Sequence, residues 1–204
     1  MAASHNDEEL LRRMLGGCAE SFEALYDRRQ GGVYRYALRM TGSEAVAEDM
    51  THEVFIQLMR DGAQFDPALG SVKSYLYGMA RHRVLRHLER ERGHVSIDAG
   101  QGDGEGLTDE RLRSCEDPFL DLERGETVSL VRQAVLSLPP HFREVIVLCH
   151  LQEMNYAEAA EVIACPVGTI RSRLARARAM LVEKLRALGG PQVGGEKLKA
   201  ERAI

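Results

Sequence analysis

The sequence predicts an all-α protein of two small helical domains joined by a flexible acidic linker. Apolar residues recur at steps of three or four in both halves of the 204-residue chain, the spacing of one helix face. No stretch shows the apolar-polar alternation of a half-buried strand. Residues from 93 to about 118 are rich in Gly, Asp, Glu and Ser, and they cannot bury enough surface to offset their ordering entropy.

The first domain is predicted to contain four helices. The first ends at Gly16-Gly17, and the second is interrupted or bent near Gly31-Gly32. The four helices are predicted at residues 8–14, 22–40, 43–59 and 72–92. The chain is then predicted to divide into a first domain at residues 8–92, a linker at 93–124, a second domain at 125–188 and a polar tail at 189–204.

The second domain is also predicted to be helical. Pro139-Pro140 stops its first helix, because proline cannot continue the backbone hydrogen bonding. The last two helices are separated by only a tight turn. The helices are predicted at residues 130–138, 142–151, 156–163 and 166–188.

The last two helices have the pattern of a helix-turn-helix, which places the start of its second helix in the major groove of DNA. Asn155 followed by Glu158 indicates an N-cap with its reciprocal partner, and Pro166 suits the first turn of the second helix. The apolar stripe of that helix is Val167, Ile170, Leu174, Ala177, Leu181, Leu185 and Leu188. The residues expected to face a DNA edge are Gly168, Thr169, Arg171, Ser172 and Arg176. The alternative is a solvated amphipathic helix with a basic face.

Charge is distributed unevenly along the chain, whose formal net charge is −4. Residues 73–92 contain six basic and two acidic residues, and residues 166–188 contain six basic and one acidic residue. Residues 91–124 contain ten acidic and four basic residues. Since local patches matter more than the total for phosphate binding, both domains are compatible with nucleic-acid binding.

Composition and motifs disfavour several classes of protein. With 44 % hydrophobic and 28 % charged residues the chain is typical of a soluble globular protein. No apolar run reaches the ~20 residues of a membrane span, and the N-terminus lacks the apolar core of a signal peptide. We therefore expect a cytoplasmic protein without membrane insertion.

Catalytic and metal motifs are also missing from the sequence. The four cysteines are scattered without a CxxC pair, which favours neither a disulfide framework nor a metal site. There is no Gly-rich phosphate loop, no HExxH and no nucleophile elbow. We therefore expect no enzymatic activity, no catalytic residues and no cofactor.

Aromatic and basic residues lie together around the long basic helix. Phe65, Tyr75 and Tyr77 are close in sequence to Lys73 and to several arginines. Aromatic faces accept unstacked bases and cations hold the backbone, which together suit single-stranded or opening DNA. That all three aromatics are core residues stays an open alternative.

The segment 47–57 carries acids and a glutamine opposite its apolar residues. One interpretation is a docking face for a basic or helical partner. The other is a face that only confers solubility.

In their order and spacing, these segments resemble bacterial RNA polymerase sigma factors, in the extracytoplasmic-function group of the sigma-70 family. The resemblance covers roughly residues 21–188. The stretches that carry it are AEDMTHEVF at 47–55, FDPALGSVKSYLYGMARHRVLRHLER at 65–90, LSLPPHFREVIVLCHLQEMNYAEAAEVI at 136–163 and CPVGTIRSRLARAR at 165–178. The family's regions two and four match the two predicted domains.

The resemblance implies a promoter-specificity subunit that binds core RNA polymerase and helps to initiate transcription at promoter DNA. It implies that the minus-thirty-five element is read by Pro166, Gly168, Thr169, Arg171, Ser172, Arg173 and Arg176. It implies that the minus-ten element is read and melted by Phe65, Asp66, Lys73, Tyr75, Arg81, His82, Arg83 and Arg86. It implies that the clamp helices of the largest polymerase subunit are bound by Asp49, Glu53 and Gln57.

The resemblance further implies that the acidic linker threads into the polymerase channel, where its carboxylates mimic RNA phosphates. It implies an anti-sigma protein as a partner that holds the chain inactive. Two positions depart from the family pattern, since Tyr75 stands where Trp is common and His82 where Asn is common. Both departures bear on melting strength and on the preferred minus-ten sequence.

Two other functions stay open at this stage. A self-sufficient helix-turn-helix regulator would bind DNA as a dimer, but the sequence has neither a heptad seam nor a ligand-binding domain. A protein-interaction adaptor would not depend on the arginines at 171 and 176.

Overall fold

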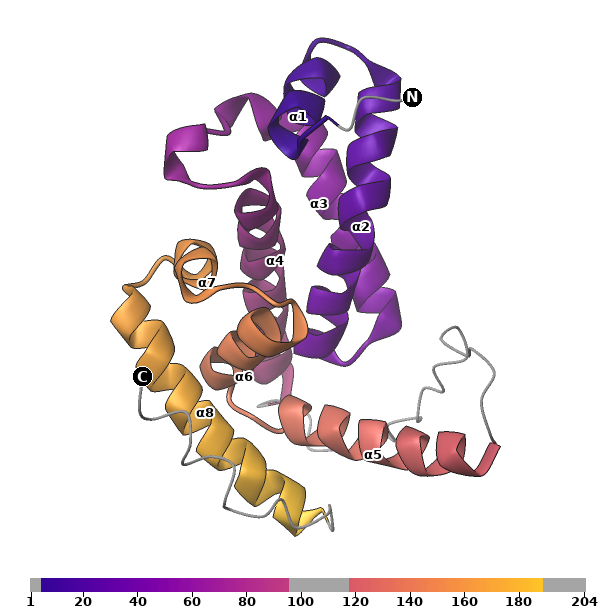
Figure 1. Ribbon diagram of the computed structural model, residues 1–204, viewed down its shortest axis with the longest axis vertical. Coiled ribbons are helices and arrows are strands. Elements are labelled where there is room, and N and C mark those ends of the chain that lie inside the picture. Colours follow the sequence, from indigo (N-terminus) through magenta and orange to yellow (C-terminus); the bar gives the residue numbers. More distant parts are fainter. Residues whose placement is uncertain (1–4, 96–117, 189–204) are drawn as a thin grey trace.

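The computed structural model describes residues 5–95 and 118–188, and within these ranges it contains helices and no strand (Figure 1). The helices are α1 (Asp7–Leu15), α2 (Ala19–Thr41), α3 (Glu44–Asp61), α4 (Val72–Val95), α5 (Pro118–Leu136), α6 (Pro140–Ile146), α7 (Tyr156–Ile163) and α8 (Val167–Ala187). Short 3-10 turns are η1 (Gly62–Gln64) and η2 (Pro67–Leu69), and a π-helical turn is η3 (Val147–Leu151). The predicted all-α class is confirmed.

Local capping signals set the ends of the first helices. The side chain of Asn6 accepts a hydrogen bond from the backbone N–H of Glu9 at 2.8 Å, which begins α1. Gly42 ends α2 in the left-handed conformation, with φ of 79°, where a residue without Cβ is favoured. The Ser43 hydroxyl then accepts from the N–H of Val46 at 3.4 Å and begins α3. Helices α1 to α4 pack together in the first half of the chain.

Helix α2 runs unbroken through Gly31 and Gly32, so the predicted interruption is wrong. A Cβ atom on Gly32 would lie 2.7 Å from the hydroxyl oxygen of Tyr77, which belongs to α4. The glycine therefore allows the two helices to cross closely, with the rings of Tyr36 and Tyr77 edge to face at 5.6 Å. Packing of α2 on α4 offsets the intrinsic cost of a helical glycine, about 1 kcal/mol.

The predicted cap of α7 is confirmed as a reciprocal capping box. The Asn155 side chain accepts from the N–H groups of Ala157 and Glu158, and the Glu158 carboxylate accepts from the N–H of Asn155 at 2.8 Å. Ala164 ends α7 in the left-handed conformation, and Pro166 directly precedes α8. Helices α7 and α8 thus flank a short turn; α8 packs on α5 and α6, whereas α7 packs on α4 and η3.

The predicted linker is shorter at both ends in the structure. Residues 93–95 belong to α4, and α5 begins at Pro118, so residues 118–124 are helical. Proline suits the first position of a helix, and the Leu, Glu and Arg residues that follow it have high helix propensity. Residues 96–117 of the predicted linker and the whole predicted tail, 189–204, lie outside the described residues.

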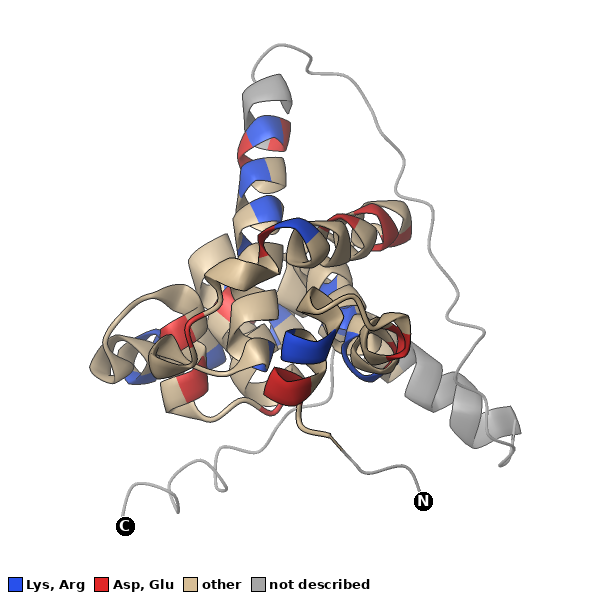
Figure 2. Cartoon of the chain, turned by 90° about the horizontal axis from the view of Figure 1, so that it is seen from above, with Lys and Arg blue, Asp and Glu red and all other residues tan. Residues whose placement is uncertain are grey.

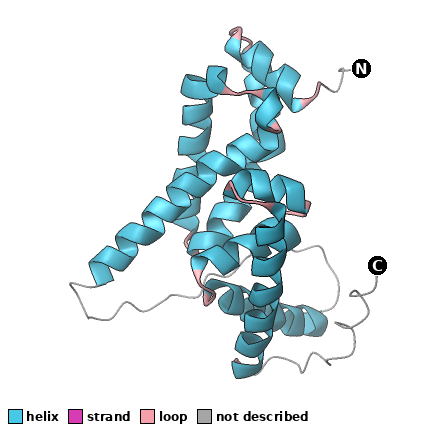
Figure 3. Ribbon diagram, turned by 90° about the vertical axis from the view of Figure 1, so that its left-hand side faces the viewer, coloured by secondary structure: helices cyan, strands magenta, loops and turns pink. Residues whose placement is uncertain are grey.

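The first half of the chain, α1 to α4, and the second half, α5 to α8, lie against each other. Within the described ranges they share one hydrophobic core. Helix α4 lies against α7, and α2 contacts α5, α6 and η3 (Figures 1 and 3). Arg39 donates to the carbonyl of Leu151 at 3.1 Å, and Arg143 donates to the carbonyl of Met40. No helix in the described ranges is both long and apolar enough to span a membrane.

Candidate nucleic-acid interface

Helix α8 is anchored on one side and cationic on the other. Ile170, Leu174 and Ala177 are buried against the second half. Of the residues expected to read the minus-thirty-five element, Thr169 and Arg173 are half-buried. The exposed members are Pro166, Gly168, Arg171, Ser172 and Arg176. A buried stripe with exposed arginines beside it is the geometry that lets a helix enter a major groove.

A contact between α7 and α8 orients part of this face. Tyr156 is 37 % exposed, and the guanidinium carbon of Arg171 lies 6.0 Å from its ring centroid. Such a cation–π contact at an exposed site contributes about 0.5–1 kcal/mol. Ser172 donates its hydroxyl to the carbonyl of Thr169 at 3.0 Å, which leaves the hydroxyl oxygen as an acceptor.

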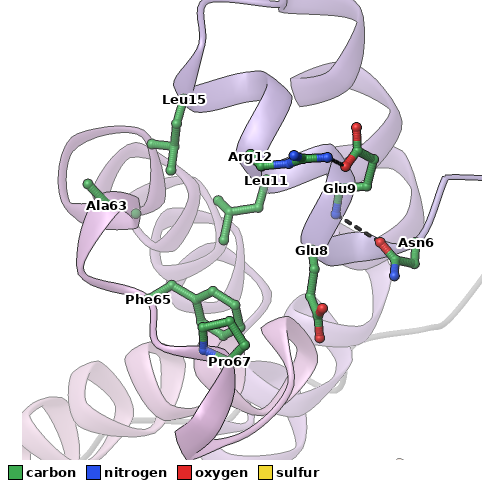
Figure 4. Close-up of a pocket in the computed structure, with 10 residues that line it drawn as sticks. Asn6, Glu8, Glu9, Leu11, Arg12, Leu15, Ala63, Phe65 and Pro67 are labelled. Atoms are coloured by element: carbon green, nitrogen blue, oxygen red, sulfur yellow. Dashed lines mark hydrogen bonds and ion pairs between the residues drawn. The ribbon is translucent and has the colours of Figure 1, made fainter.

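The loop before α4 places aromatic rings beside a pocket. The rings of Phe65 and Tyr75 are half-buried, with centroids 5.5 Å apart. Asp66 is exposed and accepts from the N–H of Ala68 at 2.9 Å, which fixes the turn η2. A pocket of about 400 Å³ lies between this loop and α1. Figure 4 shows the Phe65 ring beside Pro67 at its lower side.

The pocket itself has a mixed lining. Leu11 and Leu15 supply apolar walls from α1, while Glu8 and Arg12 supply charges at the same helix (Figure 4). Arg12 forms an ion pair with Glu9. A partly apolar hollow lined by the aromatic ring of Phe65 can hold a flat, unstacked group.

The basic residues of α4 differ in the groups that they contact. Figure 2 shows them as blue bands along this helix. Arg83 donates to Glu53 at 2.5 Å and to Gln57 at 2.8 Å, both on α3. His82 and Arg86 are exposed. The two remaining cations of the expected minus-ten set contact the second half of the chain, namely Lys73 with Glu158 and Arg81 with Glu144.

The expected polymerase-binding face lies on α3. Asp49 and Glu53 are exposed, and Gln57 is half-buried. Two large apolar side chains are exposed on the same helix, Ile56 at 58 % and Met59 at 49 %. Exposed apolar groups beside acids are typical of a protein-docking surface.

Glu144, on α6, is the one acid in the buried interior of the described residues, with 1 % exposure. Arg81 donates to its Oε1 at 2.7 Å, and the Tyr36 hydroxyl donates to the same oxygen at 3.2 Å. Burial raises the pKa of Glu144, although both donors favour the ionised form. Burial and the adjacent carboxylate together raise the pKa of Tyr36 well above its ordinary value.

Sequence reasoning did not identify these partners of α4. Glu144 and Glu161, which accepts from the Ser74 hydroxyl, lie in segments interpreted only as helices of the second domain, and Gln152, which accepts from the Tyr77 hydroxyl, lies between two of them. Their role depends on a contact between residues 63 to 87 positions apart. The sequence does contain one signal for a buried acid, since Glu144 directly precedes the apolar run at 145–148. Among the described residues, no group of His, Cys, Asp and Glu could hold a metal ion.

Two family models match the chain. Sigma-70 region 2 matches residues 25–94, and Sigma-70, region 4 matches residues 129–181. The ECF RNA polymerase sigma factor SigW of Bacillus subtilis is 29 % identical over 185 residues, which cover 87 % of this chain and 96 % of the relative. The probable RNA polymerase sigma-C factor of Mycobacterium bovis is 30 % identical over 186 residues, covering 89 % and 95 %.

Two solved structures have the same fold. The sigma factor RpoE, in complex with the anti-sigma factor NepR from Bartonella quintana, matches with a TM-score of 0.66 and 20 % identity, covering 82 % of this chain and 98 % of that one. CnrH, in complex with the cytosolic domain of CnrY, matches with a TM-score of 0.64 and 23 % identity, covering 89 % and 97 %.

Proposed function

Because the chain belongs to the sigma-70 family of RNA polymerase sigma factors, in its extracytoplasmic-function group, we propose a specific division of work among its surfaces. The protein is a promoter-specificity subunit that binds core RNA polymerase, recognises the minus-thirty-five and minus-ten elements and helps to initiate transcription. In our proposal residues 8–92 recognise the minus-ten element, and residues 125–188 recognise the minus-thirty-five element. Residues 93–124 join these two segments, and residues 189–204 are the tail.

The start of α8 enters the major groove at the minus-thirty-five element. Arg171 and Arg176 are exposed there, while Ile170 and Leu174 anchor the helix from behind. Arginines that reach base edges select sequence, and those that reach phosphates add affinity that falls as salt rises. Arg173 is half-buried, and its charge favours the ionised form of Glu144.

The loop and α4 capture the melted minus-ten strand. Phe65 and Tyr75 offer ring faces, and the adjacent pocket accepts a base that has left the stack. Stacking of a base on an aromatic side chain contributes about 1–3 kcal/mol. Phosphates of the same strand are met by exposed side chains of α4, among them the Arg86 guanidinium and the His82 imidazole.

Helix α3 docks on the polymerase. Asp49 supplies an exposed acid, and Ile56 supplies apolar surface on the same helix. Glu53 and Gln57 hold Arg83 in the free chain, so polymerase binding at this face also acts on α4.

The protein contributes binding energy and no catalysis of its own, and it acts in the cytoplasm with polymerase and chromosome. Strand separation is driven by contacts made with unpaired bases, without nucleotide hydrolysis by this chain. The RpoE structure from Bartonella quintana contains the anti-sigma factor NepR. By analogy, an anti-sigma protein covers the polymerase-binding surfaces of this chain.

The observation that carries this function is the exposed arginine face of α8 on a buried apolar stripe. Run-off transcription with purified core polymerase on genomic fragments would identify the promoter. On that promoter we expect Arg176→Ala to reduce the transcript by about 5- to 100-fold, as for loss of one groove contact. Arg186→Ala is the matched control, because Arg186 is exposed in the last turn of the same helix.

Two results would contradict the proposal. One is the absence of any promoter-specific transcript with the wild-type chain. The other is tight, specific binding of promoter duplex by the chain alone, which would favour a self-sufficient helix-turn-helix regulator.

A further inference from the structure

We propose that Arg83, on α4, is a positioning residue for polymerase binding, because it fixes the side chains of Glu53 and Gln57 on α3 in the orientation that the polymerase meets. The inference rests on the proposed function, since it adds a supporting residue to the polymerase-binding face proposed for α3. It also removes Arg83 from the basic residues of α4 that contact the minus-ten strand.

The polymerase-binding face is a row of polar side chains along α3. Asp49, Glu53 and Gln57 are spaced four residues apart, so they lie on one side of the helix. Asp49 is exposed, the side chain of Glu53 is 58 % exposed, and Gln57 is half-buried. The row is thus open to a partner protein at Asp49 and Glu53, and its last two members contact Arg83 of α4.

A single guanidinium group makes these contacts between α4 and α3. Nη1 of Arg83 donates to Glu53 Oε2 at 2.5 Å, and Nη2 donates to Gln57 Oε1 at 2.8 Å. Nη2 also donates to the backbone carbonyl of Glu53 at 3.3 Å. Because a guanidinium is rigid and planar, bonds from both of its terminal nitrogens fix where the carboxylate and the amide oxygen lie relative to each other.

Fixed side chains favour docking. Glutamate and glutamine lose rotamer freedom when an interface orders them, and this loss opposes binding. Arg83 orders Glu53 and Gln57 within the folded chain, before the polymerase is present. It contacts only Oε2 of the Glu53 carboxylate, and a carboxylate can accept further hydrogen bonds at its second oxygen. The contact therefore orients Glu53 without using its whole capacity to bind a partner.

The same contacts make Arg83 a poor ligand for a DNA phosphate. A bidentate phosphate contact uses two N–H groups on one edge of the guanidinium. The edges that include Nε are closed to DNA, because Nε of Arg83 is buried and has no hydrogen-bond partner among the described residues. The two nitrogens of the remaining edge already donate to α3. Arg86, three residues further along α4, is exposed and suits a phosphate better.

The first test measures affinity for core polymerase with the full-length chain, labelled with fluorescein at its N-terminus and followed by anisotropy. Arg83→Lys keeps the charge but cannot reach two acceptors through a planar fork. We expect it to raise the dissociation constant about 3- to 10-fold, as when one or two side chains must be ordered on binding. Arg90→Lys is the matched control, because Arg90 is exposed on the same helix, and we expect it to leave the constant unchanged.

A double-mutant cycle shows whether Arg83 acts through Glu53. In a Glu53→Ala background there is no carboxylate left to orient, so we expect Arg83→Lys to change the affinity for core polymerase by about twofold or less. Full, additive costs in the two backgrounds would overturn the proposal, because a residue that only supports the fold would act equally in both.

A neutral variant separates positioning from DNA contact. With saturating Arg83→Gln chain on core polymerase, we expect promoter binding to keep the wild-type dependence on salt. A phosphate contact at Arg83 would instead lower the slope of log affinity against log salt by about one. That lower slope, together with unchanged affinity for core polymerase, would also overturn the proposal. Failure of the wild-type chain to bind core polymerase would refute the proposed function itself.

Discussion

Glu144 brings a carboxylate into the contact between the halves, and most buried side chains of the described residues are apolar. The groups that face it are Arg81 from α4, Tyr36 from α2 and, at longer range, Arg173 from α8. Two donors and one more distant cation compensate for part of the lost hydration, but burial still raises the pKa of Glu144. This residue therefore makes the folded state sensitive to pH.

The direction of that sensitivity follows from linkage. Because the pKa of Glu144 is raised by burial, the folded protein binds its proton more tightly than the unfolded chain does. The resulting stabilisation is fully present below the ordinary carboxyl pKa and is lost as pH rises through the raised value. We expect the free energy of unfolding of the wild type, relative to Glu144→Gln, to increase as pH falls from 7.5 to 4.5 in urea titrations. A constant difference would contradict this assignment.

At the scale of elements, the crossing of α2 and α4 depends on a glycine. The Tyr77 hydroxyl occupies the space that a side chain at position 32 would need, 2.7 Å from the Cβ site. Burial raises the pKa of Tyr77 to about 12, so its hydroxyl stays protonated and donates to Gln152 at neutral pH. The crossing thus also positions a contact between the halves.

A pair of glycine substitutions tests this crossing. Gly32→Ala should destabilise the protein by about 1–3 kcal/mol, because the new methyl group forces Tyr77 to move. Gly78→Ala, in α4, meets no atom within 4 Å and should be neutral or stabilise by up to ~1 kcal/mol. Urea unfolding of both variants measures the difference. A stabilised Gly32→Ala variant would show that the close approach is not required.

Helices were predictable from the sequence wherever the signal was local. The capping box at Asn155 and the cap at Ser43 begin helices where expected, since a side chain satisfies a backbone group within three residues. The predicted break at Gly31-Gly32 failed because a tertiary contact decides that position. The early start of α5, at Pro118, was missed because acidic composition outweighed helix propensity in the interpretation.

At the scale of the whole molecule, the candidate site was only partly predictable. The basic character of α4 and α8 follows from arginine counts, but the partner of each arginine does not. Arg81 meets an acid 63 positions away and Arg83 meets one 30 positions away, so only the packed chain distinguishes them. Exposed arginines such as Arg176 stay predictions for DNA contact.

The contact between the two halves should be visible in solution. Small-angle scattering of the free chain would report the distance between the halves through the radius of gyration. Glu161→Lys removes the carboxylate that accepts from the Ser74 hydroxyl of α4 at 2.9 Å, and we expect it to increase that radius by about 3–6 Å over the wild type. Glu183, exposed on α8, gives the control, since Glu183→Lys changes the net charge equally and should leave the radius unchanged. An equally expanded wild type would show that the halves do not stay together.

A free molecule that exposes the arginines of α8 while Glu144 holds Arg81 of α4 can visit duplex DNA without keeping any bubble open. Copies not bound to polymerase would then contact chromosomal DNA only through α8, at the minus-thirty-five element of a promoter. Gene expression would depend on encounters with the polymerase, and extra copies alone would not unwind DNA at random.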